Sequence, residues 1–446
     1  MPRDIPRRRG SGAGLTLALL AALSLRCNLL VSFSDCSADS DCRSGEVCNM
    51  TRRYCEVPVA ELCNGVDDDR DGVSDDDENF GVCEPGGATT PGTCRDGVLR
   101  CRGGSRLECV RRTTPTAEDC HDGVDNDCNG TVDDSPTCVQ NYPATMNLRV
   151  GSDDPTYGEG DDAPEHRVCL APFTIDRYEV STRAFTNWLS TLDQTKLRVR
   201  APAAPLNGTV TYGDYLVFLD AAGEVPLAAM NAPDSPYAIR RTPTGWAPAS
   251  DASANLPAVF VTWYAADRYC RWAGKHLPTE AEWFRAVKGG DVENPRTYPW
   301  GEEPPTCDRA NIAVDATGLN CGRRPLPVDA LPMGANPERV FNLYGNANEW
   351  MWDWLDDDPS HTRNNYYQSL APTAWCMAFP DGPLGPSMGS PIAGDNDAGL
   401  RCAQCRFLRG RNYESVDVRV GIRRWLDPDR GEAVGGFRCS SGGAAR

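Results

Sequence analysis

Carboxylate side chains alternate with other residues in two short segments. The segments read Gly65-Val-Asp-Asp-Asp-Arg-Asp-Gly72 and Gly123-Val-Asp-Asn-Asp-Cys-Asn-Gly130, so they form an internal repeat. A hard cation needs roughly six to eight oxygen ligands, and an EF-hand loop supplies them through this alternation, with a glycine at the sharp turn. Both segments therefore predict calcium sites that stiffen the chain. The expected ligands are Asp67, Asp69, Asp71, the Val73 carbonyl, Asp75 and Glu78 in the first loop, and Asp125, Asp127, Asn129, the Thr131 carbonyl and Asp133 in the second.

A solvated acidic linker is the alternative interpretation of these carboxylates. Two copies in register, each with glycine at the same offset, favour calcium. Cysteines also bracket the loops, and we expect Cys120 and Cys128 to form disulfides. Pro136 stands where an EF-hand loop would end in glutamate, so the second cage is either weaker or closed in another way.

Composition places the chain outside the cytoplasm. Its 446 residues include 21 cysteines, which indicates an oxidising compartment. The formal charge of −18 and the lack of a long basic run argue against nucleic acid as a partner. Three arginines precede a short apolar run from Leu15 to Leu25, as in a signal peptide. Cys27 follows and suggests a lipid anchor, whereas Arg26 fits a lipoprotein site poorly and leaves ordinary cleavage and free secretion open.

The texture of the sequence divides the chain into four parts. The cysteines fall into three even groups after Cys27, and pairing within each group is the simplest expectation, although spacing does not fix connectivity. Past Cys138 aromatic residues and helix signals become regular. The predicted parts are a signal segment (1–27), a disulfide-rich knot (28–60), two acidic loops with disulfides (61–138) and a globular domain (146–440).

Helix signals in the globular part are specific. Thr279-Glu-Ala-Glu282 is a capping box, and Gly289 with the next glycine supplies a stop. Upstream, Trp263, Ala266, Cys270 and Ala273 recur at helical spacing and predict one buried face. Other segments are short and rich in Pro, Gly, Asn and Asp. An α+β domain with much irregular structure is therefore expected.

Several blocks of this part resemble the formylglycine-generating enzyme (sulfatase-modifying factor) family. They occur in family order over nearly 300 residues. They include Gly274-Lys-His-Leu-Pro-Thr-Glu-Ala-Glu-Trp283, Asn342-Leu-Tyr-Gly-Asn-Ala-Asn-Glu-Trp350 and Gly436-Phe-Arg-Cys439. The resemblance implies a C-type-lectin-like α+β fold.

The resemblance also implies structural calcium and particular disulfides. One family calcium site would use Asn342, Gly345, Ala347 and Glu349, for which turn capping and surface charge are the alternative roles. Another would use Asn311 and the Ile312 carbonyl. The implied disulfide joins Cys270 to Cys439, and Cys307 with Cys321 is a plausible local bridge.

The copper chemistry of the family is the part that the sequence does not support. Oxidase members hold copper(I) through two cysteines after the Arg-Gly strand, because a soft ion needs soft thiolates. Here no cysteine lies between Cys405 and Cys439, and Ser415 and Val420 stand near the expected positions. We therefore expect calcium but no copper.

Two functions remain open from the sequence. The first is a binding or scaffold module with a peptide, glycan or cell-envelope ligand, for which Trp350, Trp352, Trp354, Tyr366 and Tyr367 could line a site. The second is a divergent metal-dependent oxidase or formylglycine-generating enzyme that acts on proteins or peptides. No catalytic residue is predicted.

Overall fold

The computed structural model describes most of the globular part and pieces of the amino-terminal part. The described residues are 36–44, 46–49, 53–57, 62–68, 73–75, 82–83, 94, 97–102, 106–112, 114–151, 166–200, 215–221, 223–229, 237, 239–289, 296–354, 405–415 and 423–443. The predicted signal segment, Cys27, Val420, Tyr366 and Tyr367 lie outside them. By their contacts, residues 1–82 and 98–110 form one compact unit, and residues 83–97 and 111–446 form another.

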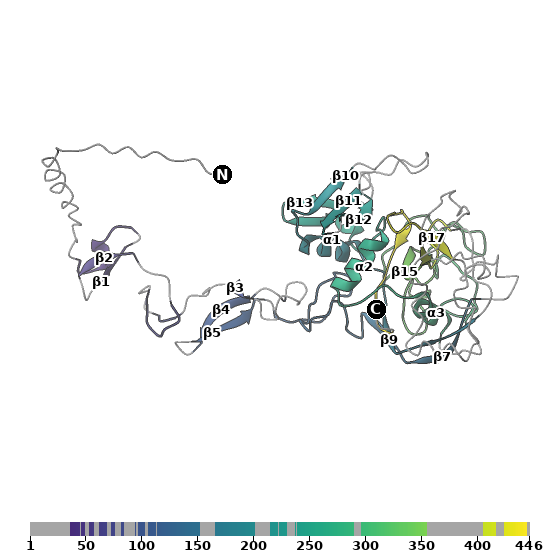
Figure 1. The fold of residues 1–446 in the computed structure, drawn as a ribbon, viewed down its shortest axis with the longest axis horizontal. Helices are drawn as coiled ribbons and strands as arrows, with labels where there is room; N and C mark the ends of the chain where they lie inside the picture. The colour runs from purple at the N-terminus through teal and green to yellow at the C-terminus, as the bar shows by residue number, and fades with distance from the viewer. Residues whose placement is uncertain are drawn as a thin grey trace, which may run out of the picture. The chain divides into compact units, whose positions relative to one another are not determined.

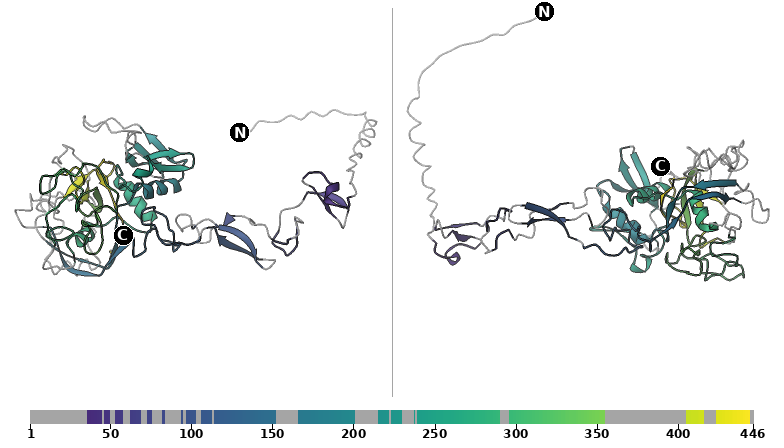
Figure 2. Two further views of the ribbon diagram at one scale, coloured as in Figure 1. Left: turned by 180° about the vertical axis from the view of Figure 1, so that it is seen from behind. Right: turned by 90° about the horizontal axis from the view of Figure 1, so that it is seen from below.

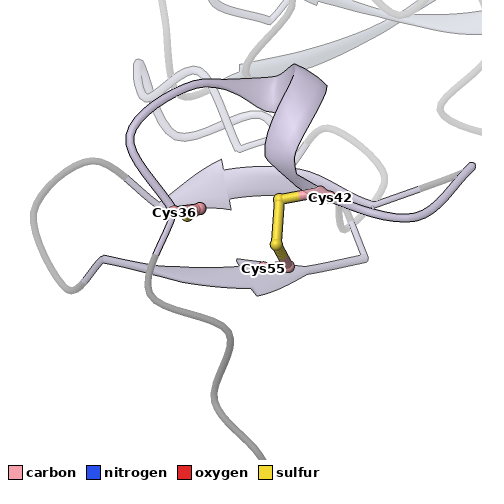
Figure 3. Close-up of side chains that lie close together, drawn as sticks. All are labelled: Cys36, Cys42 and Cys55. Atoms are coloured by element: carbon pink, nitrogen blue, oxygen red, sulfur yellow. A yellow bond between two sulfur atoms is a disulfide. The ribbon is translucent and has the colours of Figure 1, made fainter.

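The amino-terminal unit is held together by disulfides. A short hairpin of β1 (Val47–Asn49) and β2 (Tyr54–Glu56) pairs antiparallel, and η1 (Asp39–Asp41) precedes it. Cys36 bonds to Cys48 and Cys42 to Cys55, as pairing within the first group predicts. Cys36, Cys42 and Cys55 lie close together (Figure 3), but their sulfurs are consumed in disulfides, so this cluster offers no thiolate to a metal.

A three-stranded sheet follows in the sequence. Its strand order is β3-β4-β5, with β3 at Val82–Cys83, β4 at Gly97–Arg102 and β5 at Arg106–Arg111. The disulfide between Cys63 and Cys101 ties β4 to the start of the first acidic loop. Few apolar side chains are buried in these segments, so covalent bridges take the place of a core.

The larger unit contains a mixed four-stranded sheet. Its order is β17-β16-β15-β18, from β15 (Asn348–Trp354), β16 (Arg406–Arg409), β17 (Arg424–Leu426) and β18 (Gly435–Gly436). β18 runs parallel to β15, whereas the other neighbours are antiparallel. The yellow carboxy-terminal strands therefore lie beside green β15 in Figures 1 and 2.

The described residues of the larger unit also form four smaller sheets and three α-helices. One sheet has the order β19-β9-β6, from β19 (Ser440–Gly442), β9 (Phe173–Asp176) and β6 (Val139–Tyr142), and a second pairs β7 (Thr145–Val150) with β8 (His166–Leu170). A third has the order β10-β11-β12, from β10 (Leu197–Arg200), β11 (Tyr215–Asp220) and β12 (Gly223–Ala229). The fourth pairs β13 (Ile239–Thr242) with β14 (Gly245–Pro248). The helices are α1 (Thr182–Thr191), α2 (Trp263–Trp272) and α3 (Glu280–Lys288), and a 3-10 turn, η3, spans Asp251–Ser253. In the described part of the chain, no helix is long and apolar enough to cross a membrane.

The helix signals of the sequence are confirmed. The Thr279 hydroxyl accepts from the Glu282 amide while the Glu282 carboxylate accepts from the Thr279 amide, and α3 ends before Gly289 at φ +83°. The predicted face of α2 is buried, and its most exposed member, Trp263, is 5% exposed. This face packs in one hydrophobic core with Trp188 and Phe437. A second core gathers around Trp283 of α3. The mixed, sheet-rich fold with few helices agrees with the expected α+β class.

Glu280 is buried between two arginines. The carboxylate receives hydrogen bonds from Arg409 of β16 and from Nε and Nη2 of Arg423, and all three side chains are at most 1% exposed. Burial alone would raise the pKa of Glu280, but the two guanidinium groups outweigh it and lower that pKa to about 2. The carboxylate is therefore charged at every physiological pH.

Replacing Glu280 with glutamine should strongly destabilise the larger unit. The substitution removes the charged carboxylate that both buried guanidinium groups share, so we expect a loss of about 3–5 kcal/mol in urea unfolding. Glu432→Gln is the matched control, since Glu432 pairs with Arg424 whose side chain is 41% exposed, and it should cost less than about 1 kcal/mol. Similar losses for the two variants would contradict this account.

Candidate functional site

Part of the first acidic loop lies in the described residues of the amino-terminal unit. The Asp75 carboxylate accepts backbone amides of Asn64 and Gly65 at 2.9 Å each, so it closes the loop back onto its own start. Asp67 and Val73 lie within the described residues. The Asp67 side chain is half-buried, and Val73 is exposed. The predicted ligands Asp69, Asp71 and Glu78 lie outside the described residues.

The second acidic loop is folded around Asp125. This residue is fully buried, and its two carboxylate oxygens accept the amides of Asn129 and Gly130 at 3.1 and 2.9 Å. Gly130 has φ +100°, a left-handed conformation that glycine adopts without strain. The predicted sharp turn is therefore present at this glycine.

Glu118 is the acidic residue that the sequence analysis missed. Its carboxylate accepts the amide of Asp127 at 2.8 Å and that of Asp133 at 3.0 Å. Carboxylate oxygens of Glu118, Asp125 and Asp127 lie within 4.8 Å of one another, close enough to share one cation. Glu118 precedes the loop, so no EF-hand spacing could identify it.

Electrostatics at this cluster favour a positive partner. Burial raises the pKa of Glu118, and the nearby Asp127 charge adds to that increase. Burial likewise raises the pKa of Asp125, against hydrogen bonds from the turn that lower it. A bound cation would offset both penalties, because it stabilises the charged carboxylates.

Two other predicted ligands of the second loop have partners of their own. Asn129 is exposed, and its side-chain oxygen accepts the Thr131 amide at 2.9 Å. The Asp133 side chain instead lines a cavity of about 20 Å³ together with Asp176 and Lys275. The structure therefore gathers Asp125 and Asp127 with Glu118 and places Asp133 at the base of the loop.

The second loop is packed onto the rest of its unit. Ser181 donates to the carbonyl of His121, and Lys275 donates to that of Asp133 at 3.0 Å. Disulfides reinforce the segment, since Cys120 bonds to Cys138 and Cys128 to Cys94. The two acidic loops thus belong to different compact units.

The residues of the implied family calcium sites come together in the core. Asn311 and Ile312 are at most 2% exposed, and Asn342, Gly345, Ala347 and Glu349 are also buried. The Asn346 amide donates to the Asn311 carbonyl at 2.8 Å, which joins the two segments. A Cβ on Gly345 would lie 2.7 Å from that carbonyl oxygen, so only glycine fits there.

Asn311 fits a hard cation. Its side-chain nitrogen donates to the carbonyl of Arg324 and to the side-chain oxygen of Asn346. Its side-chain oxygen is buried and has no hydrogen-bond partner among the described residues. A buried amide oxygen of this kind is costly unless an ion or water accepts its lone pairs.

Glu349 has a partner of its own. Arg438 donates to both of its carboxylate oxygens at 2.6 and 2.8 Å, and both side chains are fully buried. A cation near Glu349 would have to share the carboxylate with Arg438. Glu179, which sequence reasoning missed, lies beside this pair. Its carboxylate accepts hydrogen bonds from the side-chain amide of Asn342 and the backbone amide of Ala347. Burial and the Glu349 charge raise the pKa of Glu179 to about 8.

The implied disulfides are present in the structure. Cys270 is bonded to Cys439 across 169 residues, and Cys307 to Cys321 across 14. Ser415, near one expected copper position, accepts the Ala313 amide with its backbone carbonyl and the Asn412 amide with its hydroxyl oxygen. It therefore serves as a turn residue that holds the segment after β16.

Gly123 provides a test of how the second loop is held. Its φ is +63°, and a Cβ there would meet the Tyr269 hydroxyl at 2.8 Å and Ala184 at 2.9 Å. Gly123→Ala should therefore cost about 1–3 kcal/mol beyond the left-handed strain and speed proteolysis within residues 114–138. Gly318→Ala is the control, because φ is +86° but nothing lies within 4 Å. Equal losses of urea stability would show that the contact is unimportant.

Comparisons with known proteins agree on one family. The sulfatase-modifying factor enzyme 1-like domain family matches residues 133–441. The formylglycine-generating enzyme of Thermomonospora curvata is 31% identical over 309 residues, which cover 66% of this chain and 90% of that protein. The enzyme of Bos taurus is 32% identical over 240 residues, and the match spans 49% of this chain but only 58% of the cattle protein.

A more distant relative bears a different activity in its name. Hercynine oxygenase of Mycolicibacterium thermoresistibile is 31% identical over 200 residues, which cover 44% of this chain and 38% of that protein. Among solved structures, variable protein 1 of Treponema denticola aligns with TM-score 0.42 and 17% identity over 68% of this chain and 94% of that one. From the profile match and the Thermomonospora relative together, residues 133–441 belong to the formylglycine-generating enzyme (sulfatase-modifying factor) family.

Proposed function

We propose that this protein is an extracytoplasmic, calcium-binding member of the family that serves as a binding or scaffold module. One observation carries most weight: the sequence has no cysteine between Cys405 and Cys439, where oxidase members hold copper. Copper(I) needs thiolates, which no oxygen or imidazole ligand set replaces easily. The many disulfides support an oxidising compartment.

Calcium is proposed at two kinds of site. In the second acidic loop, Glu118, Asp125 and Asp127 would hold the ion through carboxylate oxygens. In the core, the orphaned side-chain oxygen of Asn311 would contribute to a structural ion with the Ile312 carbonyl. Calcium would neutralise buried negative charge and fix the loops, and no chemical step is assigned to it.

A lectin-like surface is the proposed means of binding a peptide, glycan or cell-envelope polymer. Trp350 is fully buried and donates to the Val261 carbonyl, so it belongs to the core. Trp352 and Trp354 are half-buried and pack against Trp263, and the exposed parts of their rings would contribute to a ligand surface. Fold alone does not select among these ligands.

A divergent oxidase is the second candidate. It is favoured by relatives that are named formylglycine-generating enzymes and hercynine oxygenase. Such an activity would need a metal held by ligands other than the paired cysteines of the family. Turnover is therefore the property that separates the two candidates.

Calcium binding can be tested by calorimetry on the full chain after removal of divalent ions. Glu118→Gln removes one of the clustered charges, so we expect one calcium site to weaken about tenfold or more, because affinity follows ligand charge. Asp119→Asn is the control, since Asp119 is exposed and pairs with Arg183. A parent protein without calcium-dependent heat, or a Glu118→Gln isotherm identical to that of the parent, would refute the site.

Copper chemistry can be tested with the purified chain and copper(I), with the disulfides kept intact. We expect no stoichiometric copper(I) retained against a chelator and no oxygen uptake with a cysteine-containing peptide, whereas an oxidase of the family run in parallel should show both. Tight copper(I) binding, or turnover with copper or iron, would reject the scaffold proposal in favour of the oxidase.

A further inference from the structure

His276 lies where the carboxy-terminal strand meets the turn before α3. Its backbone exchanges hydrogen bonds with Ser440, at 2.8 Å from the His276 amide and 2.7 Å from the Ser440 amide. β19 stands at the edge of its three-stranded sheet, with β9 as its strand partner. His276 therefore covers the other side of β19 through an isolated bridge.

Both ring nitrogens of His276 face backbone carbonyls. Nδ1 lies 3.0 Å from the Leu277 oxygen, and Nε2 lies 3.0 Å from the Gly442 oxygen. A carbonyl oxygen only accepts, so each contact requires a proton on the nitrogen. Neutral imidazole carries one N–H and the imidazolium carries two. Only the charged ring can donate both bonds.

Charged groups on the neighbouring elements have partners of their own. From α3, the Glu282 carboxylate lies beside the turn that follows β19, since a Cβ on Gly443 would be 2.4 Å from its Oε1. The neighbouring cation Lys275 is engaged elsewhere, with Asp176 of β9 at 2.7 Å and with the Asp133 carbonyl. From β15, Asp353 accepts the Glu280 amide at the start of α3.

We propose that His276 is an imidazolium clasp for the carboxy-terminal strand and that its deprotonation loosens residues 440–443. The sign follows from the geometry. The folded state holds the charged ring, so the clasp is complete below the ordinary histidine range near about pH 6.5 and is lost as pH rises through the titration midpoint of the folded protein. Cys439 stays anchored by its disulfide to Cys270, so the loosening is confined to the residues after it.

The test measures the ring and the strand separately on the full chain. Carbon-13 labelling of the four histidines gives the titration of each Cε1–H by nuclear magnetic resonance, with His276→Gln assigning the signal. We expect the midpoint of His276 to lie above the ordinary value of about 6.5. Hydrogen exchange of the 440–443 segment, corrected for intrinsic rate, should accelerate about tenfold or more across that midpoint.

Two substitutions separate a charged clasp from simple packing. His276→Arg keeps donors and charge at all pH values, so the strand should stay protected above the midpoint of the parent. His276→Gln should exchange fast at both low and high pH. His121→Gln, which alters a ring whose centroid lies 4.7 Å from that of Tyr178, should behave as the parent does. A neutral His276 at pH 6, or an arginine variant that still loses protection at high pH, would overturn the proposal.

Discussion

The buried pair of Arg438 and Glu349 is the interaction on which the larger unit depends. Arg438 donates to both oxygens of Glu349 and also to the carbonyls of Asp176 and Phe341. One guanidinium thus joins β15, β9 and the loop before β15. A buried ion pair is tolerable only when its remaining hydrogen bonds are satisfied, and here the backbone supplies them. The arrangement of these segments is therefore fixed by charge as well as by packing.

A second buried carboxylate, that of Glu179, lies beside this pair. Glu179 and Glu349 are both fully buried or nearly so, and Arg438 is the cation that lies against them. Burial and the neighbouring Glu349 charge both disfavour the charged form of Glu179, so the pKa of Glu179 rises to about 8. A proton on Glu179 or a hard cation near Asn311 would reduce the free-energy penalty of this buried negative charge. The region is thus suited to cation binding for reasons independent of any sequence motif.

Local features of this fold were predictable from sequence, and contacts between distant segments were not. The capping box at Thr279 and the buried face of α2 depend on residues three or four apart, so spacing reveals them. The disulfide between Cys270 and Cys439 followed from the family resemblance, because spacing alone leaves connectivity open.

The acidic loop illustrates the limit most clearly. Alternating aspartates predicted the turn around Asp125, but the carboxylate that completes the cluster comes from Glu118, upstream of the motif. Asp133 fits the motif and yet faces Asp176 and Lys275, because the packing of the loop on the core turns it inward. Residue spacing describes the loop in isolation. In the folded protein, Glu118 takes part in the carboxylate cluster and Asp133 does not.

The state of the cysteines bears directly on what metal chemistry this scaffold can carry. Every cysteine in the described ranges is disulfide-bonded, including Cys405 next to β16. A disulfide sulfur is a poor ligand compared with a thiolate, so these residues stabilise the chain and do not bind soft metals. Within the described ranges, the oxygens of Glu118, Asp125 and Asn311 are groups placed where a cation could be held. Oxygen ligands favour hard cations such as calcium, and this preference is the chemical basis of the proposed calcium-binding function.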